Sequence, residues 1–140
     1  MVKDSILYEA GCRERTYCAG ELIDCMPFTS EMYGQLAAGS IELTVFDSVQ
    51  KVVARQSLEK GNFLGISRLF TQKKYPLKLS AKSNCTVLEL PVQDFMNILH
   101  QHPNYSERFC RKIMDNLRNV LSKKERGNDG FGYTTYYDCI

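Results

Sequence analysis

The chain has 140 residues, of which 44% are hydrophobic and 24% charged, and its formal net charge at pH 7 is +2. This composition indicates one globular domain with a substantial core, in a chain too short for two full-sized domains. The near-balanced charge argues against bulk electrostatic binding to nucleic acid or to an acidic membrane. No apolar run approaches the ~20 residues that a membrane-spanning helix needs.

The amino-terminal residues Met1–Ser5 include an acid and lead into no apolar signal-peptide core, so we expect a cytoplasmic protein. There is no C-x-x-C pair, and the only histidines are His100 and His102, which argues against a zinc site. A secreted disulfide scaffold would be denser in cysteine. We therefore expect reduced cysteines buried as small apolar side chains, with no metal and no cofactor. The six cysteines are Cys12, Cys18, Cys25, Cys85, Cys110 and Cys139.

From Thr16 to Leu90 the sequence consists of short extended segments separated by turn residues. The clearest alternation of apolar and polar residues lies in Ile41–Phe46, where Glu42 and Thr44 are the polar members, and predicts a half-buried strand. Many short strands with turns between them indicate a sandwich or a barrel. The other extended segments are Leu22–Ile23, Met32–Ala37, Val52–Leu58, Phe63–Gly65, Leu77–Ser80, where Lys78 should point to solvent, and Cys85–Leu90.

After Pro91 the apolar period becomes helical, and a first helix should end at His102–Pro103. A longer helix follows, from about Tyr105 to Lys124, before Gly127. Its apolar stripe must be buried, either against a second copy of the chain or against the preceding β region, and the sequence leaves both open. The stripe, which we expect to mediate dimerisation if the partner is a second copy, is Phe109, Ile113, Leu117, Val120 and Leu121. We assign 1–126 to one domain and 127–140 to a Gly-rich, aromatic tail.

Five short motifs, in this order and with these gaps, resemble the cyclic-nucleotide-binding domain, the sensory half of regulators of the catabolite activator type. The resemblance covers about Arg15 to Leu121 and implies a mainly β fold, a double-stranded β-helix or jelly roll, followed by two helices. That fold agrees with the one predicted from the pattern alone. The motifs are Tyr17-x-Ala-Gly-Glu21-x-Ile23, Met32-Tyr33-x-Gln-Leu-Ala-Ala-Gly39-Ser-Ile-Glu-Leu43, Leu58-x-x-Gly61-Asn-Phe63-Leu-Gly65, Ala81-x-Ser-x-Cys85-x-Val87-Leu-x-Leu90 and Phe95-x-x-x-Leu99-x-x-x-Pro103.

The family holds a cyclic phosphate in a cassette made of a Gly, a short helix whose N–H groups face the phosphate, and an Arg on the next strand. A Glu after the Gly accepts a hydrogen bond from the ribose. On this mapping Gly65 matches the family Gly and Ser67–Phe70 the short helix. Ile66 stands at the Glu position, and Tyr75, followed by Pro76, stands at the Arg position.

Both polar anchors of the cassette are therefore replaced, and each charged hydrogen bond is worth about 1.5–3 kcal/mol. The resemblance thus implies a pocket for a small effector other than cyclic AMP, with a less polar lining at Ile66 and Tyr75. Arg68, on the predicted short helix, could replace a lost cation, or it is an ordinary solvated side chain.

Other classes of function have weaker support. A jelly-roll metalloenzyme needs histidines and a carboxylate that converge inside the barrel, whereas His100 and His102 lie beyond the β region and are expected to be surface or capping residues. No nucleophile elbow, Walker-type loop or pair of catalytic carboxylates is present, so we predict no catalytic residue. Relatives of the family include iron–sulfur sensors, but the spacing of Cys12, Cys18 and Cys25 departs from that pattern.

Family regulators bind DNA through a helix-turn-helix module after the long helix. Only residues 127–140 follow Arg126 here, too few for a three-helix reader, so DNA binding requires a module absent from this chain. We predict a non-catalytic sensory domain of a transcription regulator, with an unidentified small-molecule effector as its partner. The alternative is a structural dimerisation or docking module with an emptied pocket.

Overall fold

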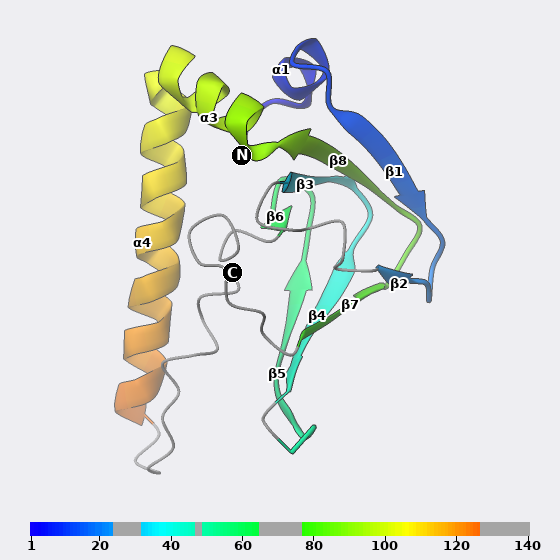
Figure 1. Ribbon diagram of the computed structural model, residues 1–140. Coiled ribbons are helices and arrows are strands. Elements are labelled where there is room, and N and C mark those ends of the chain that lie inside the picture. Colours follow the sequence, from blue (N-terminus) through cyan, green and yellow to red (C-terminus); the bar gives the residue numbers. More distant parts are fainter. Residues whose placement is uncertain (24–31, 47–48, 65–76, 127–140) are drawn as a thin grey trace.

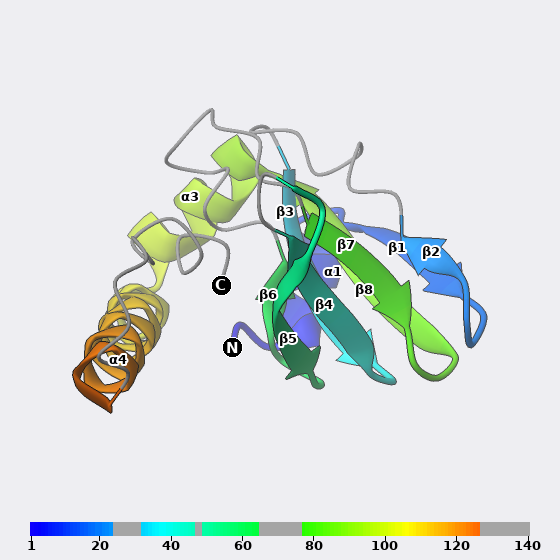
Figure 2. The same ribbon diagram turned by 90° about the horizontal axis from the view of Figure 1, so that it is seen from below.

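The computed structural model describes residues 1–23, 32–46, 49–64 and 77–126. Two four-stranded antiparallel sheets pack face to face, which confirms the predicted jelly roll (Figure 1; Figure 2). In the first sheet the order is β1 (Arg13–Tyr17), β8 (Cys85–Pro91), β3 (Met32–Ala38) and β6 (Phe63–Leu64). In the second sheet the order is β2 (Leu22–Ile23), β7 (Leu77–Ala81), β4 (Ile41–Phe46) and β5 (Val52–Leu58).

Within the described ranges, three helices accompany the first sheet: α1 (Asp4–Glu9), α3 (Val92–Gln101) and α4 (Pro103–Arg126) (Figure 1). The two carboxy-terminal helices confirm the prediction. Helix α1 was not predicted, because it has only six residues and Leu7 is its only buried side chain. The β region also begins earlier than expected, at Arg13 instead of Thr16.

Strand β8 has a buried side chain on both faces and so separates two apolar cores. Leu88 and Leu90 face the helices, whereas Cys85 and Val87 face the second sheet. The outer core, between the first sheet and the helices, consists of Val2, Leu7, Tyr33, Phe63, Leu88, Leu90, Phe95, Ile98, Leu99, Tyr105 and Phe109. The inner core, between the sheets, consists of Ile23, Leu36, Ile41, Leu43, Val45, Leu58, Leu64, Leu79, Ala81, Cys85 and Val87.

The amino-terminal segment is held against β3 by one side chain. The buried amide of Gln35 accepts a hydrogen bond from the Val2 N–H (3.2 Å) and donates one to the Val2 carbonyl (2.8 Å). It also accepts from the Tyr33 hydroxyl (2.8 Å) and donates to Asp4 (3.0 Å). The side-chain amide of Gln35 therefore pairs with both backbone groups of Val2, as a neighbouring strand would. This pairing positions α1 over the outer core.

The turn between β3 and β4 depends on a glycine. Gly39 has a φ of +79°, and a Cβ added there would lie 2.3 Å from the carbonyl oxygen of Asn84 and 2.6 Å from the Cβ of Cys85. The start of β8 thus packs directly on this turn, and only glycine fits the position.

Several smaller expectations have mixed outcomes. Lys78 is exposed, as predicted, but Thr44 is buried, so β4 is covered on both faces at that residue. Of the four cysteines in the described ranges, Cys85 is buried as predicted and Cys12 is half-buried. The prediction was wrong for Cys18, which lies in the turn after β1, and for Cys110, on the solvent side of α4. Cys25 and Cys139 lie outside the described residues.

In the part of the chain that the structure describes, no helix is long and apolar enough to cross a membrane.

Candidate functional site

The predicted phosphate cassette lies outside the described residues, and its flanking strands fix where it begins and ends. Strand β6 precedes it in the first sheet, and β7 follows it in the second sheet. The cassette segment therefore connects the two sheets that enclose the inner core. The predicted site residues in this segment are Gly65, Ile66, Ser67, Arg68, Tyr75 and Pro76.

Among the described residues, Glu89 on β8 has the most unusual environment. Its side chain is only 2% exposed. One carboxylate oxygen, Oε2, lies 3.0 Å from Nε of Arg15 on β1. The other oxygen, Oε1, is buried and accepts no hydrogen bond within the described part of the chain. An unpaired buried carboxylate oxygen is costly, so its position is informative.

The strand register explains why Glu89 points between the sheets. Alternate residues of a strand share a face, so Glu89 lies on the same face as Val87 and Cys85, which belong to the inner core. Its register neighbour on β3 is Gly34, and the neighbour of Gly34 on β6 is Leu64. Gly34 itself contributes no side chain beside the carboxylate. Leu64 is also the last described residue before the cassette segment.

Sequence reasoning did not identify Glu89, although a signal was present. In Cys85–Leu90 the residues at positions 85, 87 and 89 share one face of a strand. With Cys85 and Val87 assigned to the core, a charged residue at the next position of that face predicts an inward-pointing carboxylate. The partner is harder to predict from sequence, because Arg15 is more than 70 residues away in the chain and meets Glu89 only through the pairing of β1 with β8.

Two weakly acidic groups lie on the same side of the first sheet. Burial is the main cause that raises the pKa of Tyr17, and the neighbouring guanidinium of Arg15 partly opposes this increase. Burial also raises the pKa of the Cys85 thiol. Both groups therefore remain protonated at neutral pH. The charged groups at this position are then a carboxylate and the guanidinium that pairs with it, an arrangement suited to recognising a polar group.

A separate pocket of about 330 Å³ lies on the helical side of the molecule. His102 ends α3, where its N–H bonds the carbonyl of Ile98, and packs edge-on against Tyr105. His102 is thus a capping residue, and His100 is exposed, as predicted. This pocket is not between the sheets and does not include the predicted cassette. It is lined by Lys3, Ile6, Gln101, His102, Pro103, Asn104, Tyr105 and Arg108.

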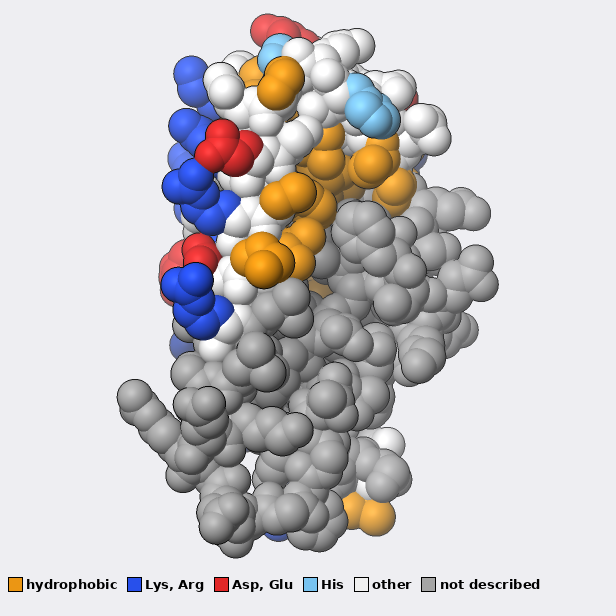
Figure 3. Space-filling view, turned by 90° about the vertical axis from the view of Figure 1, so that its left-hand side faces the viewer, with side chains coloured by type: hydrophobic (Ala, Val, Ile, Leu, Met, Phe, Trp, Pro, Cys, Tyr) orange, Lys and Arg blue, Asp and Glu red, His pale blue; other side chains and the backbone are white. Residues whose placement is uncertain are grey.

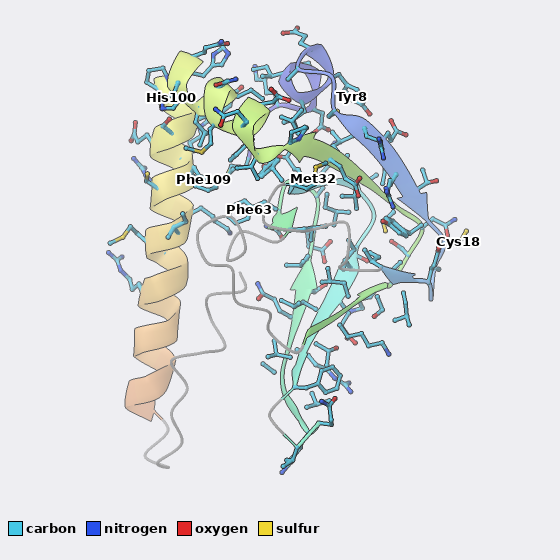
Figure 4. All side chains as sticks on the ribbon, in the orientation of Figure 1. Tyr8, Cys18, Met32, Phe63, His100 and Phe109 are labelled. Atoms are coloured by element: carbon cyan, nitrogen blue, oxygen red, sulfur yellow. The ribbon has the colours of Figure 1, made fainter. Side chains whose placement is uncertain are left out.

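The predicted dimerisation stripe begins inside the protein's own outer core. Phe109 is 5% exposed and Ile113 is partly buried against the same core, whereas the side chains of Leu117, Val120 and Leu121 lie outside the described residues. Figure 4 shows Phe109 pointing toward Phe63 of β6, and their ring centroids are 5.7 Å apart.

On the outside of α4, by contrast, Met114 is 63% exposed and Cys110 is also exposed. Apolar side chains line this face of the molecule beside a row of basic ones (Figure 3). No group of three or more potential metal-ligating side chains gathers among the residues that the structure describes.

The family model and the solved structures that match this chain agree with each other. The family model described as "Cyclic nucleotide-binding domain" matches residues 14–102. No curated protein matches the sequence. A solved transcriptional regulator from Thermotoga maritima has a TM-score of 0.75 at 16% identity, over 88% of this chain and 95% of that one.

Two further structures of this kind are longer than the present chain. The catabolite activator protein of Thermus thermophilus has a TM-score of 0.71 at 14% identity, over 89% of this chain and 59% of that one. The c-di-GMP-responsive regulator of Xanthomonas campestris has a TM-score of 0.65 at 15% identity, over 87% of this chain and 60% of that one. The chain therefore spans about three fifths of the length of these two regulators. At such low identity, the likeness shows a shared fold.

Proposed function

Because the chain belongs to the cyclic nucleotide-binding domain family, we propose that it is a non-catalytic sensory domain that binds a small effector other than cyclic AMP between its two sheets. The proposal is supported by the sequence of the segment that joins β6 to β7, in which the motif mapping assigns Ile66 and Tyr75 to the positions of the family's polar anchors. Without those anchors, the free energy that would hold a cyclic phosphate is reduced by several kcal/mol, at about 1.5–3 kcal/mol for each charged hydrogen bond.

The fold offers a route from the effector to α4. Neighbouring residues of β6 point to opposite faces: Leu64 lies in the inner core and Phe63 in the outer core. Phe63 in turn contacts Phe109 of α4. A ligand that moves the segment after Leu64 therefore also moves the surface on which α4 packs. Such a shift requires an effector with different affinities for the two arrangements.

We further propose that this domain is the sensory part of a longer cytoplasmic transcription regulator that forms homodimers through α4 and binds DNA through a module outside the present sequence. This arrangement is supported by the two longer regulators, because the present chain matches only about three fifths of the length of each. The exposed Met114 and Cys110 give α4 an outward apolar surface that can contact a second copy.

The first test is a thermal-shift screen of the purified protein with cyclic AMP, cyclic GMP, sugar phosphates and aromatic acids. A ligand at about a hundred times its dissociation constant adds ~2.7 kcal/mol, which raises Tm by several degrees in a domain of this size. We expect no shift with cyclic AMP and a shift with another compound. A clear shift with cyclic AMP would show that the assigned positions of the anchors are wrong.

The second test restores the anchors. The double variant Ile66→Glu, Tyr75→Arg should gain cyclic AMP binding, measured by titration calorimetry, because it supplies a ribose acceptor and a phosphate partner together. Each single variant is the matched control and should gain less. A folded double variant with no gain would contradict the mapping of the cassette.

The exposed side of α4 supports one alternative function, a structural dimerisation or docking module with an emptied pocket. This alternative predicts that no compound in the screen changes Tm, while the protein remains dimeric in light scattering. Met114→Asp should then dissociate the dimer without changing the far-UV circular dichroism, because Met114 makes little contact with its own core.

A further inference from the structure

We propose that the pocket where α1 meets the corner between α3 and α4 is a binding site for a small aromatic phosphate monoester. The phosphate group lies among Lys3, His102 and Arg108, which line this pocket. The ring lies against Pro103 and Tyr105, which line it as well. This inference goes beyond the proposed function and is independent of it, because none of these residues belongs to the cassette segment.

The pocket is formed by three parts of the chain that lie at one end of the molecule (Figure 1). Lys3 precedes α1, and Ile6 lies on it. His102 is at the corner after α3, and Tyr105 and Arg108 lie at the start of α4. The volume of about 330 Å³ is near the lower end of the range for small-molecule pockets, roughly 300–1,000 Å³. A ligand with one ring and one phosphate group suits that size.

The lining of this pocket is basic. Lys3 and Arg108 are among the lining residues, and no lining residue is an aspartate or a glutamate. Neither cation forms an ion pair with an acid in the described part of the chain. The acids next to them in sequence have other partners: Asp4 accepts a hydrogen bond from Gln35 at 3.0 Å, and Glu107 forms an ion pair one turn further along α4. A bound anion therefore meets two cations that no described acid pairs with.

Other positive charges lie close to Arg108. Lys112 is four residues further along α4, so the two side chains are neighbours on the helix surface. Burial is the main cause that lowers the pKa of the Met1 ammonium group; Arg108 and Lys112 also lower it, and Asp4 opposes them. Cations that are held close together repel one another, and a bound anion reduces this repulsion.

Tyr105 positions two of the donors around the pocket. Its side chain is 8% exposed and belongs to the outer core, so its ring is held in place. His102 meets this ring edge-on, with centroids 5.7 Å apart. The guanidinium carbon of Arg108 lies 6.0 Å from the centre of the same ring. Side chains that are already held by a neighbour lose less conformational entropy when they bind a ligand.

The donors and the apolar walls together define the ligand class. A phosphate monoester carries a charge of about −1.5 to −2 at pH 7 and presents three acceptor oxygens. These oxygens match an ammonium group, a guanidinium group and an imidazole N–H, whereas a carboxylate has one charge and only two oxygens. Ile6, Pro103 and Tyr105 provide apolar surface for an attached ring.

The first experiment tests the ligand class by titration calorimetry with phenyl phosphate, inorganic phosphate, benzoate and phenol. We expect phenyl phosphate to bind about tenfold more tightly or better than each of the others, because each of them lacks the ring, the phosphate group or all charge. Equal binding of inorganic phosphate or of benzoate overturns the assigned class. No binding of phenyl phosphate at about 1 mM overturns the site itself.

The second experiment locates the site with variants that remove the same charge. Lys3→Gln and Arg108→Gln should each weaken the binding of phenyl phosphate about tenfold or more. Arg118→Gln is the matched control, because Arg118 is exposed on the same helix but does not line the pocket, and it should change the affinity by less than about twofold. All three positions are exposed, so folding should be retained, which far-UV circular dichroism checks. Equal affinities in the three variants overturn the site.

Hydrogen exchange of the unmodified protein provides a readout that needs no variant. Phenyl phosphate should slow amide exchange in residues 3–9 and 101–108, because it joins α1 to the corner between α3 and α4. Slower exchange only in the strands of the two sheets overturns this site and supports binding between the sheets. No change in exchange anywhere overturns this site and leaves the proposed effector pocket to its own thermal-shift screen.

Discussion

The ring of Phe95 on α3 lies parallel to the ring of Tyr33 on β3, with centroids 3.7 Å apart and planes inclined by 7°. Phe109 of α4 meets the same Phe95 ring edge-on, at 5.5 Å. Phe95 therefore joins both carboxy-terminal helices to the first sheet, and it supports α4 together with the direct contact between Phe109 and Phe63.

Phe95→Ala should destabilise the domain by about 3–5 kcal/mol, because it removes a fully buried ring and leaves a cavity among aromatic neighbours. Urea unfolding measures this loss. Phe95→Leu should cost less, since it keeps most of the buried volume. Val49→Ala, at a highly exposed position, is the control and should change stability by less than about 0.5 kcal/mol. Similar midpoints for Phe95→Ala and the control would contradict the central place of this ring.

Gly39→Ala should destabilise the fold more than Gly20→Ala. Both glycines have a positive φ, +79° and +85°, so each substitution carries the cost of a left-handed residue, about 1–2 kcal/mol. A Cβ at Gly20 meets nothing within 4 Å, whereas at Gly39 it collides with the backbone of Asn84 and Cys85. This overpacking should add about 1–3 kcal/mol. Equal Tm values for the two variants would show that β8 does not pack on this turn as described.

Gln35→Met should loosen the amino-terminal segment. The variant keeps the shape of the side chain but leaves the Val2 N–H and carbonyl without their buried partner, at about 1–3 kcal/mol for each group. Hydrogen exchange followed by mass spectrometry should show faster exchange in residues 2–9. Gln101→Met, on the exposed end of α3, is the matched control and should leave this region protected. Unchanged exchange in Gln35→Met would mean that the outer core alone holds α1.

Stability should decrease above pH 10 because of Tyr33. Burial raises the pKa of this phenol above its ordinary value of 10.0. Above pH 10 the unfolded chain loses the proton while the folded protein keeps it, so the equilibrium shifts toward unfolding by up to about 1.4 kcal/mol for each pH unit. Tyr33→Phe should flatten this part of the curve of unfolding free energy against pH. A slope that is the same in both proteins would contradict the assignment.

The fold was largely predictable from the sequence because its strands alternate clearly and its helices begin after Pro91. Two elements are exceptions, one for a local reason and one for a long-range reason. Helix α1 buries only one side chain, which gives too weak a periodic signal. Strand β1 consists mostly of polar residues, and it is a strand because it pairs with β8, a contact that lies more than 60 residues away in the sequence.

The candidate site was only partly predictable, for a different reason. The resemblance assigns the cassette to the segment between β6 and β7, and this assignment stays a prediction because that segment lies outside the described residues. It could not identify Glu89, because family motifs point to the phosphate anchors and not to the opposite strands. The pairing of Glu89 with Arg15 arises from register, which a single sequence specifies only through the pattern of neighbouring core residues.

The position of β8 in the first sheet has a consequence for the synthesis of this protein. Strand β8 ends at Pro91, yet it lies between β1 and β3, which are made much earlier. A nascent chain therefore carries β1 without its partner until residues 85–91 have left the ribosome. During that interval the open edge of β1 can pair with other chains, and co-translational chaperones have their best opportunity to bind. Chains truncated before Pro91 should therefore aggregate when they are released from the ribosome. Chains that include all of α4 should be released as folded domains.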